Sequence, residues 1–223
     1  MTLTEIIRTI SQKTFDLVMP PLCAYCRKFM ESRTVFCDTC QKKIEPIVSQ
    51  TIRLTDTKSM KVFAVSAYKD PLRSLILSKS RSDIVSSRQL GQLVWDMTYV
   101  KNSHFDFIVP IPLHWTRFAR RGFNQSYEMA KVIGKKSGKP VVKLIRRIRI
   151  TKYQASLSQS MRAENVKKAF ILKGKQLNLY QGKHLLLVDD LLTTGSTVMA
   201  VARELYKLKP ASITVVVACR VSS

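Results

Sequence analysis

The stretch HLLLVDDLLTTGSTV, from His184 to Val198, decides the fold of this chain. Its four apolar residues, Leu185–Val188, are typical of a strand buried on both faces of a parallel sheet. Two adjacent carboxylates, Asp189 and Asp190, come at the carboxyl end of that strand, where open α/β sheets bind their ligands. A run of small polar residues, Thr193–Thr197, then turns the chain into a helix. The pattern therefore predicts a strand, a ligand-binding turn and a helix.

The residues of this turn are suited to an anion. Gly195 lets the backbone approach a ligand closely, and the amides at the start of a helix favour phosphate. Hydroxyl groups come from Thr193, Thr194, Ser196 and Thr197. The two carboxylates suit a group that donates hydrogen bonds or sits beside a cation. A sugar phosphate with free hydroxyls, together with Mg²⁺, satisfies both halves; the alternative is a capped helix that merely follows a strand. A Walker loop is excluded because its glycine-lysine pattern is absent.

The composition predicts a globular protein with a large excess of positive charge. The chain has 223 residues, 45% of them hydrophobic, and 38 Lys and Arg against 15 Asp and Glu give a net charge of +23. Such an excess attracts nucleic acid, phosphorylated metabolites or anionic membrane. The segment from Met129 to Ala163 holds ten basic residues and no acidic one. The alternative for this segment is a solvated surface without a ligand.

The first helix-like segment, residues 3–18, places its apolar residues near one face but is interrupted by charges. It is therefore not the apolar core of a secretion signal, and no run approaches the roughly 18 apolar residues of a membrane span. We expect a soluble, cytoplasmic protein. The segment could pack on the core, form a dimer contact or lie on a membrane surface.

Four of the five cysteines form the pattern C-x2-C-x10-C-x2-C, namely Cys23, Cys26, Cys37 and Cys40. Two such pairs complete a tetrahedral four-thiolate zinc site with no open position, so the metal is expected to be structural. Disulfides are the alternative, which a reducing cytosol disfavours, and a redox C-x-x-C is weaker still. Cys219 lies apart, in a segment that predicts a buried strand.

Strand-like and helix-like segments alternate after the cysteines. Strands are expected at 61–68, 105–112, 183–190 and 211–221, and helices at 71–80, 86–100, 123–136 and 195–209. This alternation predicts an α/β fold, a parallel sheet flanked by helices, with a small N-terminal four-cysteine zinc knob. We expect two domains, residues 1–50 with the zinc knob and residues 51–223 with the sheet. Asn124 and Gln125 could be a helix cap or ligand contacts.

The acid pair and the turn together resemble the signature of type I phosphoribosyltransferases. The resemblance implies that Thr193–Thr197, Gly195 included, hold the 5′-phosphate of phosphoribosyl pyrophosphate (PRPP). It further implies that Asp189 and Asp190 contact the ribose hydroxyls and that Mg²⁺ binds with PRPP.

Three further segments narrow the resemblance to the ComF competence family. VPIPLHWTRFARRGFNQSYEMA (109–130), TKYQASLSQSMRAENVKKAF (151–170) and YKDPLRSLILSKSR (68–81) are similar to segments of that family, as is the four-cysteine knob. One segment departs from the pattern expected for that family. Its basic loop is expected to contain Lys-Phe and glycine, and this chain has SKSRSDI (78–84) instead. Candidate pyrophosphate contacts are Lys79, Arg81, Arg120 and Arg121.

The family's setting implies the handling of incoming single-stranded DNA in the cytoplasm during natural transformation, with other competence proteins as further candidate partners. Candidate DNA contacts are Arg117, Arg120, Arg121, Arg146, Arg147, Arg149 and Lys152; solvated surface charge is the alternative for them. The region that would select an acceptor has few aromatic residues, Tyr153 and Phe170 being the evident ones, and so favours a strand over a nucleobase. An active phosphoribosyltransferase of nucleotide salvage or synthesis is the alternative function, and a membrane-associated adaptor is a third. Whether catalysis survives is left open by the sequence.

Overall fold

The computed structural model of this chain describes residues 20–47, 49–78, 84–149 and 169–221. The chain divides into two compact units, the smaller ending at Lys43 and the larger beginning at Ile44. The helix predicted over residues 3–18 lies outside the described residues, and so do Lys79, Arg81, Lys152 and Tyr153.

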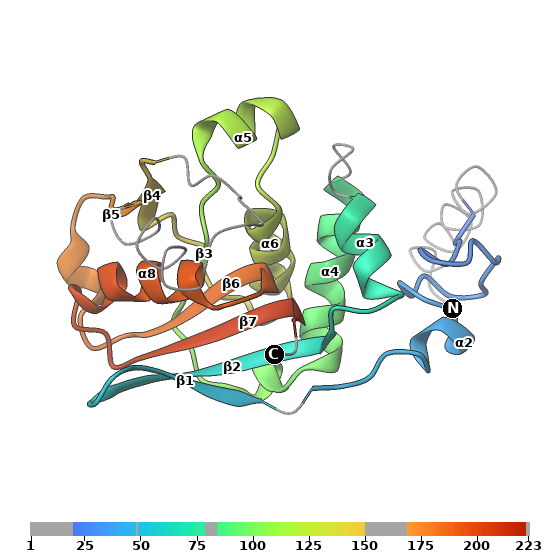
Figure 1. Cartoon of the computed structure of the whole chain (residues 1–223), viewed down its shortest axis with the longest axis horizontal. Helices are drawn as coiled ribbons and strands as arrows, with labels where there is room; N and C mark the ends of the chain where they lie inside the picture. Colours follow the sequence, from blue (N-terminus) through green and yellow to red (C-terminus); the bar gives the residue numbers. More distant parts are fainter. Residues whose placement is uncertain (1–19, 48, 79–83, 150–168, 222–223) are drawn as a thin grey trace, which may run out of the picture. The chain divides into compact units, whose positions relative to one another are not determined.

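A five-stranded sheet forms the centre of the larger unit (Figure 1). In spatial order its strands are β1 (Gln50–Thr55), β2 (Lys58–Ala67), β7 (Ser212–Arg220), β6 (His184–Leu192) and β3 (Phe107–Pro110). The last four strands run parallel, which confirms the predicted parallel sheet. Only two residues, Asp56 and Thr57, connect β1 to β2, and so short a connection joins antiparallel neighbours. The sheet is therefore mixed, with one antiparallel edge strand.

Helices cover both faces of this sheet. One face is covered by α3 (Leu72–Ser78), α4 (Ile84–Met97) and α6 (Gln125–Ser137). The other face is covered by α8 (Ser196–Tyr206) and by a small antiparallel sheet of β4 (Ile145–Arg147) and β5 (Phe170–Leu172). Strand β6 is buried on both sides. Leu185 and Leu187 join the core cluster that contains Val201 and Leu205 of α8. Leu186 points to the opposite face by the alternation of a strand and is fully buried there.

The outer edge of β3 is paired with a short segment of chain rather than with a sixth strand. The amide of Ile108 donates to the carbonyl of Pro140 at 3.0 Å, and the amide of Val142 donates to the carbonyl of Ile108 at 2.8 Å. Strand β3 itself ends at Pro110, which has no amide proton to donate.

The remaining elements are short. They are α2 (Asp38–Gln41) in the smaller unit, and α5 (Trp115–Arg121) and the 3-10 helices η2 (Tyr99–Asn102) and η3 (Leu177–Tyr180) in the larger one. Asn124 caps α6, because its side-chain oxygen accepts from the amide of Ser126 at 3.1 Å. Of the two roles that the sequence left open for Asn124, the helix cap is the one the structure shows.

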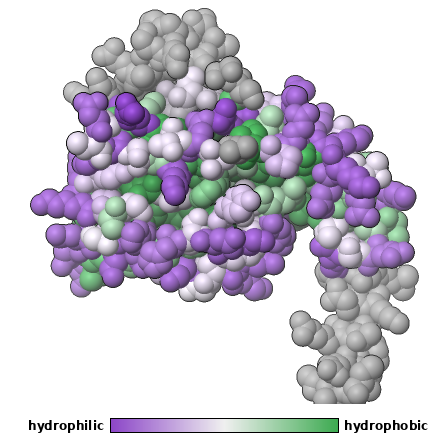
Figure 2. Space-filling view, turned by 90° about the horizontal axis from the view of Figure 1, so that it is seen from below, coloured by the Kyte–Doolittle hydropathy of each residue, from purple (hydrophilic) through white to green (hydrophobic). Residues whose placement is uncertain are grey.

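The surface carries the polar residues that the composition demands. Figure 2 shows one side of the molecule, on which hydrophilic residues fill most of the rim and hydrophobic residues gather in a band between them. Within the described ranges, no helix combines the length and the apolar character needed to cross a membrane.

Helices α4 and α6 approach each other closely at Gly91. A Cβ atom at this position would lie 2.9 Å from both the Cα and the carbonyl oxygen of Met129 and 3.1 Å from the Cβ of Val132. Two of these neighbours are backbone atoms, so a side chain could be accommodated only by moving one helix away from the other. The glycine therefore sets the distance between the two helices.

We expect Gly91→Ala to lower the free energy of unfolding by about 2 kcal/mol. Overpacking costs up to about 3 kcal/mol, of which the better helix propensity of alanine returns about 1. Urea denaturation followed by circular dichroism measures the change. Val85→Ala, in the same helix but 62% exposed, is the control and should stay within about 0.5 kcal/mol of the wild type. Equal midpoints for Gly91→Ala and the wild type would show that the helices can separate without cost.

Candidate functional site

The two carboxylates of the opening stretch lie close to the carboxyl end of β6. Asp189 pairs with Val217 of β7, and the strand continues to Leu192, two residues beyond the predicted end. Asp189 Oδ1 accepts hydrogen bonds from Ser126 Oγ and from the amide of Asp190, each at 2.9 Å. Both acids are half-buried, so they keep access to a ligand while the strand fixes their backbone.

The turn after β6 leads into a helix whose first amides have no side-chain cap. Gly195 occupies the N-cap position of α8 with φ of 74°, in the left-handed region that glycine adopts without strain. The hydroxyl groups of Thr194 and Ser196 are 2.8 Å apart and form a hydrogen bond with each other. An uncapped helix start with hydroxyl groups beside it matches the anion site that the sequence predicts.

Each of the two acids interacts electrostatically with one arginine, Asp189 with Arg147 and Asp190 with Arg121. The pKa of Arg147 is lowered to about 10 by burial and, to a smaller extent, by the charge of Arg117, while the carboxylate of Asp189 acts in the opposite direction. The pKa of Arg121 is lowered chiefly by burial. The charge of Asp190 raises it, and the charges of Arg117 and Arg120 lower it. The site therefore holds several cations in a partly dehydrated place.

Two further observations describe the polar groups at this place. The Nε atom of Arg121 is buried and has no hydrogen-bond partner among the described residues. His114 caps α5 by accepting from the amide of Thr116, and burial lowers its pKa, with the charges of Arg147 and Arg117 adding to the effect. A neutral His114 avoids one more charge in a crowded cluster.

The arginines that the sequence grouped as DNA contacts fall into two sets. Arg120, Arg146 and Arg149 are exposed, whereas Arg117, Arg121 and Arg147 are partly buried. Arg146 and Arg147 are neighbours on β4, so their side chains point to opposite faces. The inner set lies with the acids, and the outer set is free to meet a ligand at the surface.

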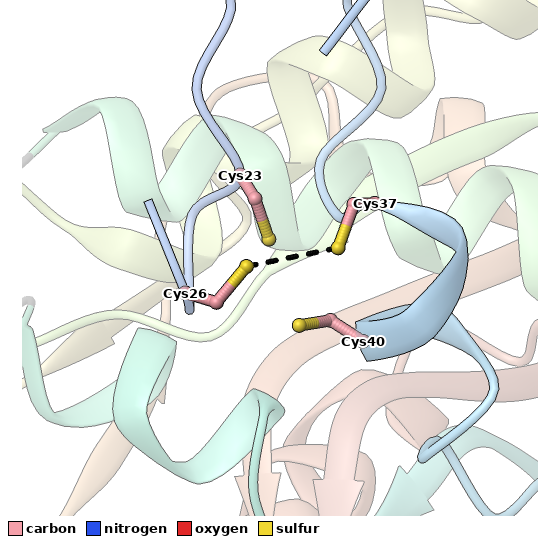
Figure 3. Close-up of side chains that lie close together, drawn as sticks. All are labelled: Cys23, Cys26, Cys37 and Cys40. Atoms are coloured by element: carbon pink, nitrogen blue, oxygen red, sulfur yellow. Dashed lines mark hydrogen bonds between the residues drawn. The ribbon is translucent and has the colours of Figure 1, made fainter. Parts of the chain in front are cut away.

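The four cysteines come together in the smaller unit (Figure 3). Their sulfur atoms all lie within 4.8 Å of one another, and those of Cys26 and Cys37 are 3.7 Å apart. A tetrahedron of thiolates at the Zn–S distance of about 2.3 Å has edges of about 3.8 Å, so the group fits zinc. All five cysteines are free, so the cluster lacks the disulfides that the sequence left as an alternative.

Local hydrogen bonds build this cluster. The amide of Arg27 donates to the carbonyl of Cys23 at 3.0 Å, which closes the first turn, and Arg27 has φ of 63°. The amide of Gln41 donates to the carbonyl of Cys37 at 2.8 Å as α2 begins. Among residues 20–43 of this unit, few others are buried, so the metal would supply much of the folding energy of this part.

The thiols of the cluster differ in their tendency to ionise. Burial disfavours the thiolate of Cys23, but hydrogen bonds from the backbone of Cys37, Cys26 and Tyr25 outweigh it and lower the pKa to about 6. Burial raises the pKa of Cys40 to about 12, and the neighbouring thiols and the charge of Cys23 act in the same direction. Several thiolates are thus unfavourable together unless a cation joins them.

The predicted site lacks three aromatic residues near the basic segments, namely Trp115, Phe118 and Tyr127. All three line one cavity of the larger unit. The signal was available for Trp115 and Phe118, because two aromatic residues three apart on a short basic helix share one face.

Comparisons with known proteins cover the segments that form this site. Residues 93–223 match the phosphoribosyl transferase domain family, so the match includes the acid pair, the turn and the basic residues from Arg117 to Arg149. The chain is 33% identical over 167 residues to the DNA utilization protein YhgH of Salmonella typhi, with 72% of each chain covered. It is 28% identical over 195 residues to competence protein F of Haemophilus influenzae, which covers 84% of this chain and 80% of the relative.

One solved structure similar to the chain is an allosteric regulatory enzyme of purine biosynthesis. The TM-score is 0.40 and the identity 17%, over 59% of this chain and 25% of the solved chain.

We expect the purified protein to contain about one zinc ion per chain, because four thiolates close a tetrahedral site. Cys37→Ser should lose most of this zinc and make the smaller unit sensitive to protease, while the larger unit stays folded. Elemental analysis and limited proteolysis measure the two effects. Cys219→Ala is the matched control, since this buried thiol lies in β7, outside the cluster, and its loss should leave the zinc content unchanged. A metal-free preparation with four reduced cysteines and an intact fold would contradict the assignment.

Proposed function

Because this chain belongs to the ComF family of proteins with a phosphoribosyl transferase domain, we propose that it binds PRPP with Mg²⁺ beside β6. One observation carries the proposal: a short turn joins the acid pair to an uncapped helix start, and each acid interacts electrostatically with a partly buried arginine. PRPP has the matching parts, which are a 5′-phosphate, two ribose hydroxyls and a pyrophosphate group.

Each part of the ligand has a counterpart in the site. The amides and hydroxyls of Thr193–Thr197 would donate to the 5′-phosphate, as helix starts commonly do. The ribose hydroxyls would donate to Asp189 and Asp190. The pyrophosphate would accept from Arg121 and Arg147, whose cluster has an excess of positive charge. Asp189 and Asp190 would hold Mg²⁺ beside the ligand, and the ion would stabilise charge on a leaving pyrophosphate.

The second part of the proposal is that single-stranded DNA binds the outer basic surface. Arg120, Arg146 and Arg149 are exposed and do not belong to the inner group around the acids. A relative named competence protein F and others named DNA utilization protein agree with such a partner. Release of pyrophosphate from Mg-PRPP in the presence of candidate acceptors would favour the alternative, an active transferase.

We expect Asp190→Asn to weaken Mg-PRPP binding at least about tenfold, or ~1.4 kcal/mol, the scale of a charge-assisted hydrogen bond. The change keeps the shape of the side chain but removes its charge and turns one acceptor into a donor. Isothermal titration calorimetry measures the affinity. Asp96→Asn is the control. This exposed acid lies near the end of α4, from which the chain continues to the start of β3, whereas the acid pair lies near the end of β6. Unchanged affinity in the double variant Asp189→Asn/Asp190→Asn rejects the site.

Arg147 and Arg146 offer a matched pair of variants. Arg147→Met should weaken Mg-PRPP binding by at least about tenfold, since a charge in a partly dehydrated site binds anions strongly. It should not destabilise the ligand-free protein, because it removes a charge that burial and Arg117 disfavour. Arg146→Met, one residue away and exposed, should change neither property. Thermal unfolding with and without ligand tests both; equal ligand-induced shifts for the two variants would remove Arg147 from the site.

A further inference from the structure

We propose that the aromatic side chains of Trp115 and Phe118 on α5 form a platform on which the bases of single-stranded nucleic acid stack, above a cavity rimmed by cations. The inference rests on the proposed strand binding and goes beyond it, because it names the contacts that recognise bases rather than phosphates. No residue of this platform belongs to the acid pair or the phosphate turn.

Helix α5 displays its aromatic residues instead of burying them. None of its seven residues is buried; Trp115 is 70% exposed and Phe118 is 49% exposed. The two lie three positions apart, so they share one face of the helix. Burial of apolar surface is what normally stabilises a short amphipathic helix, and α5 gains little of it. Its ends are fixed instead by the His114 cap and by the hydrogen bond from the amide of Gly122 to the carbonyl of Phe118, at 2.7 Å.

The aromatic face borders a cavity of about 600 Å³. Trp115 and Phe118 line it together with Tyr127 of α6, and Ile148, which follows β4, adds a further partly exposed apolar side chain. A volume of this size accommodates one or two nucleobases within the range of small-ligand sites. The lining of the cavity thus presents apolar aromatic surface on which the flat face of a nucleobase can stack.

The charges around the cavity suit a polyanion. Lys143, Arg146, Arg147 and Lys173 line it, against one acid, Glu128. Glu128 is already engaged, by Arg88 at 3.1 Å and by Lys131 at 2.6 Å, so the lining stays strongly cationic. Lys143 lies with its Nζ 4.2 Å from the ring centroid of Tyr127, which shows cation and aromatic ring already combined in the wall.

Single-stranded nucleic acid fits this combination better than the other polyanions. Its exposed bases stack on aromatic side chains while its backbone follows a basic groove, and every base has a face to stack. A phosphopeptide brings phosphates but no repeated flat rings. A membrane surface would need apolar residues that project from a convex face, whereas these aromatic residues border a hollow.

The test is a fluorescence-anisotropy titration of labelled oligothymidine with the full chain. Trp115→Ala and Phe118→Ala should each weaken binding by about 5- to 150-fold, the range measured for the loss of one base stack. Because stacking releases no counterions, both variants should keep the wild-type slope of log K against log salt. Arg146→Ala should instead flatten that slope by about 0.7, the contribution of one phosphate contact on a single strand. Tyr99→Ala is the control, an aromatic residue that is 73% exposed but does not line the cavity, and it should change nothing.

A second measurement uses Trp115 as its own probe. The chain has two tryptophans, and Trp95 lies within α4, so stacking should quench the fluorescence of Trp115 in the wild type and not in Trp115→Phe. Trp115→Phe keeps an aromatic ring and should retain most of the affinity, which separates stacking from a general loss of structure. An abasic strand of equal length should bind the wild type as weakly as oligothymidine binds Trp115→Ala.

The outcomes separate the inference from the function on which it rests. Failure of the wild type to bind oligothymidine at low salt rejects strand binding itself, and the platform with it. If the wild type and both alanine variants bind the strand with the same affinity, the platform is rejected and strand binding is not. Tighter binding to vesicles of anionic phospholipid or to a phosphoserine peptide, weakened by the same two variants, would assign the aromatic face to a different partner and overturn the proposal.

Discussion

The burial of β6 between two layers is the constraint on which the rest of the structure depends. Leu185 and Leu187 face α8, Leu186 faces the opposite layer, and all three are almost completely buried. Carboxylates cannot be tolerated in the fully buried part of the strand, Leu185–Val188, so the first acids occur where the side chains of β6 become half-buried. The chain then has to leave the sheet, and it does so through a glycine at the start of α8. Placing acids and amides side by side is thus a consequence of how the core is covered.

Much of this arrangement could be predicted because it depends on local patterns. The apolar run before Asp189 and the cysteine spacing are patterns within short segments, and the structure shows the strand and the cluster where they were expected. For Asn124 the sequence left a helix cap and a ligand contact open, and the structure shows the cap. The antiparallel partner of β2 also has a local cause, because the connection between β1 and β2 is only two residues long.

Other features depend on contacts between distant segments and could not be predicted. Arg146 and Arg147 are indistinguishable in the sequence, and only the pairing of β4 with β5 shows which of them turns inward. The attraction between Arg147 and Asp189 joins residues about forty positions apart, for which no periodicity gives a signal. Trp115 differs from these cases, because its spacing to Phe118 did carry a signal. It was overlooked because a helix without buried residues does not produce the apolar pattern by which helices are recognised.

The covered edge of β3 has a consequence for the behaviour of the chain in a crowded cell. Open sheet edges recruit strands from other molecules and so lead to aggregation. Here one edge strand is only four residues long, ends in a proline and is already paired at Ile108 with residues 140–142. The other edge, β1, alternates exposed and half-buried side chains along its length and carries a charge at Arg53. A strongly basic protein would meet high local concentrations of itself wherever several copies gathered on one polyanion, and the described edges of this sheet offer a second copy little backbone with which to pair.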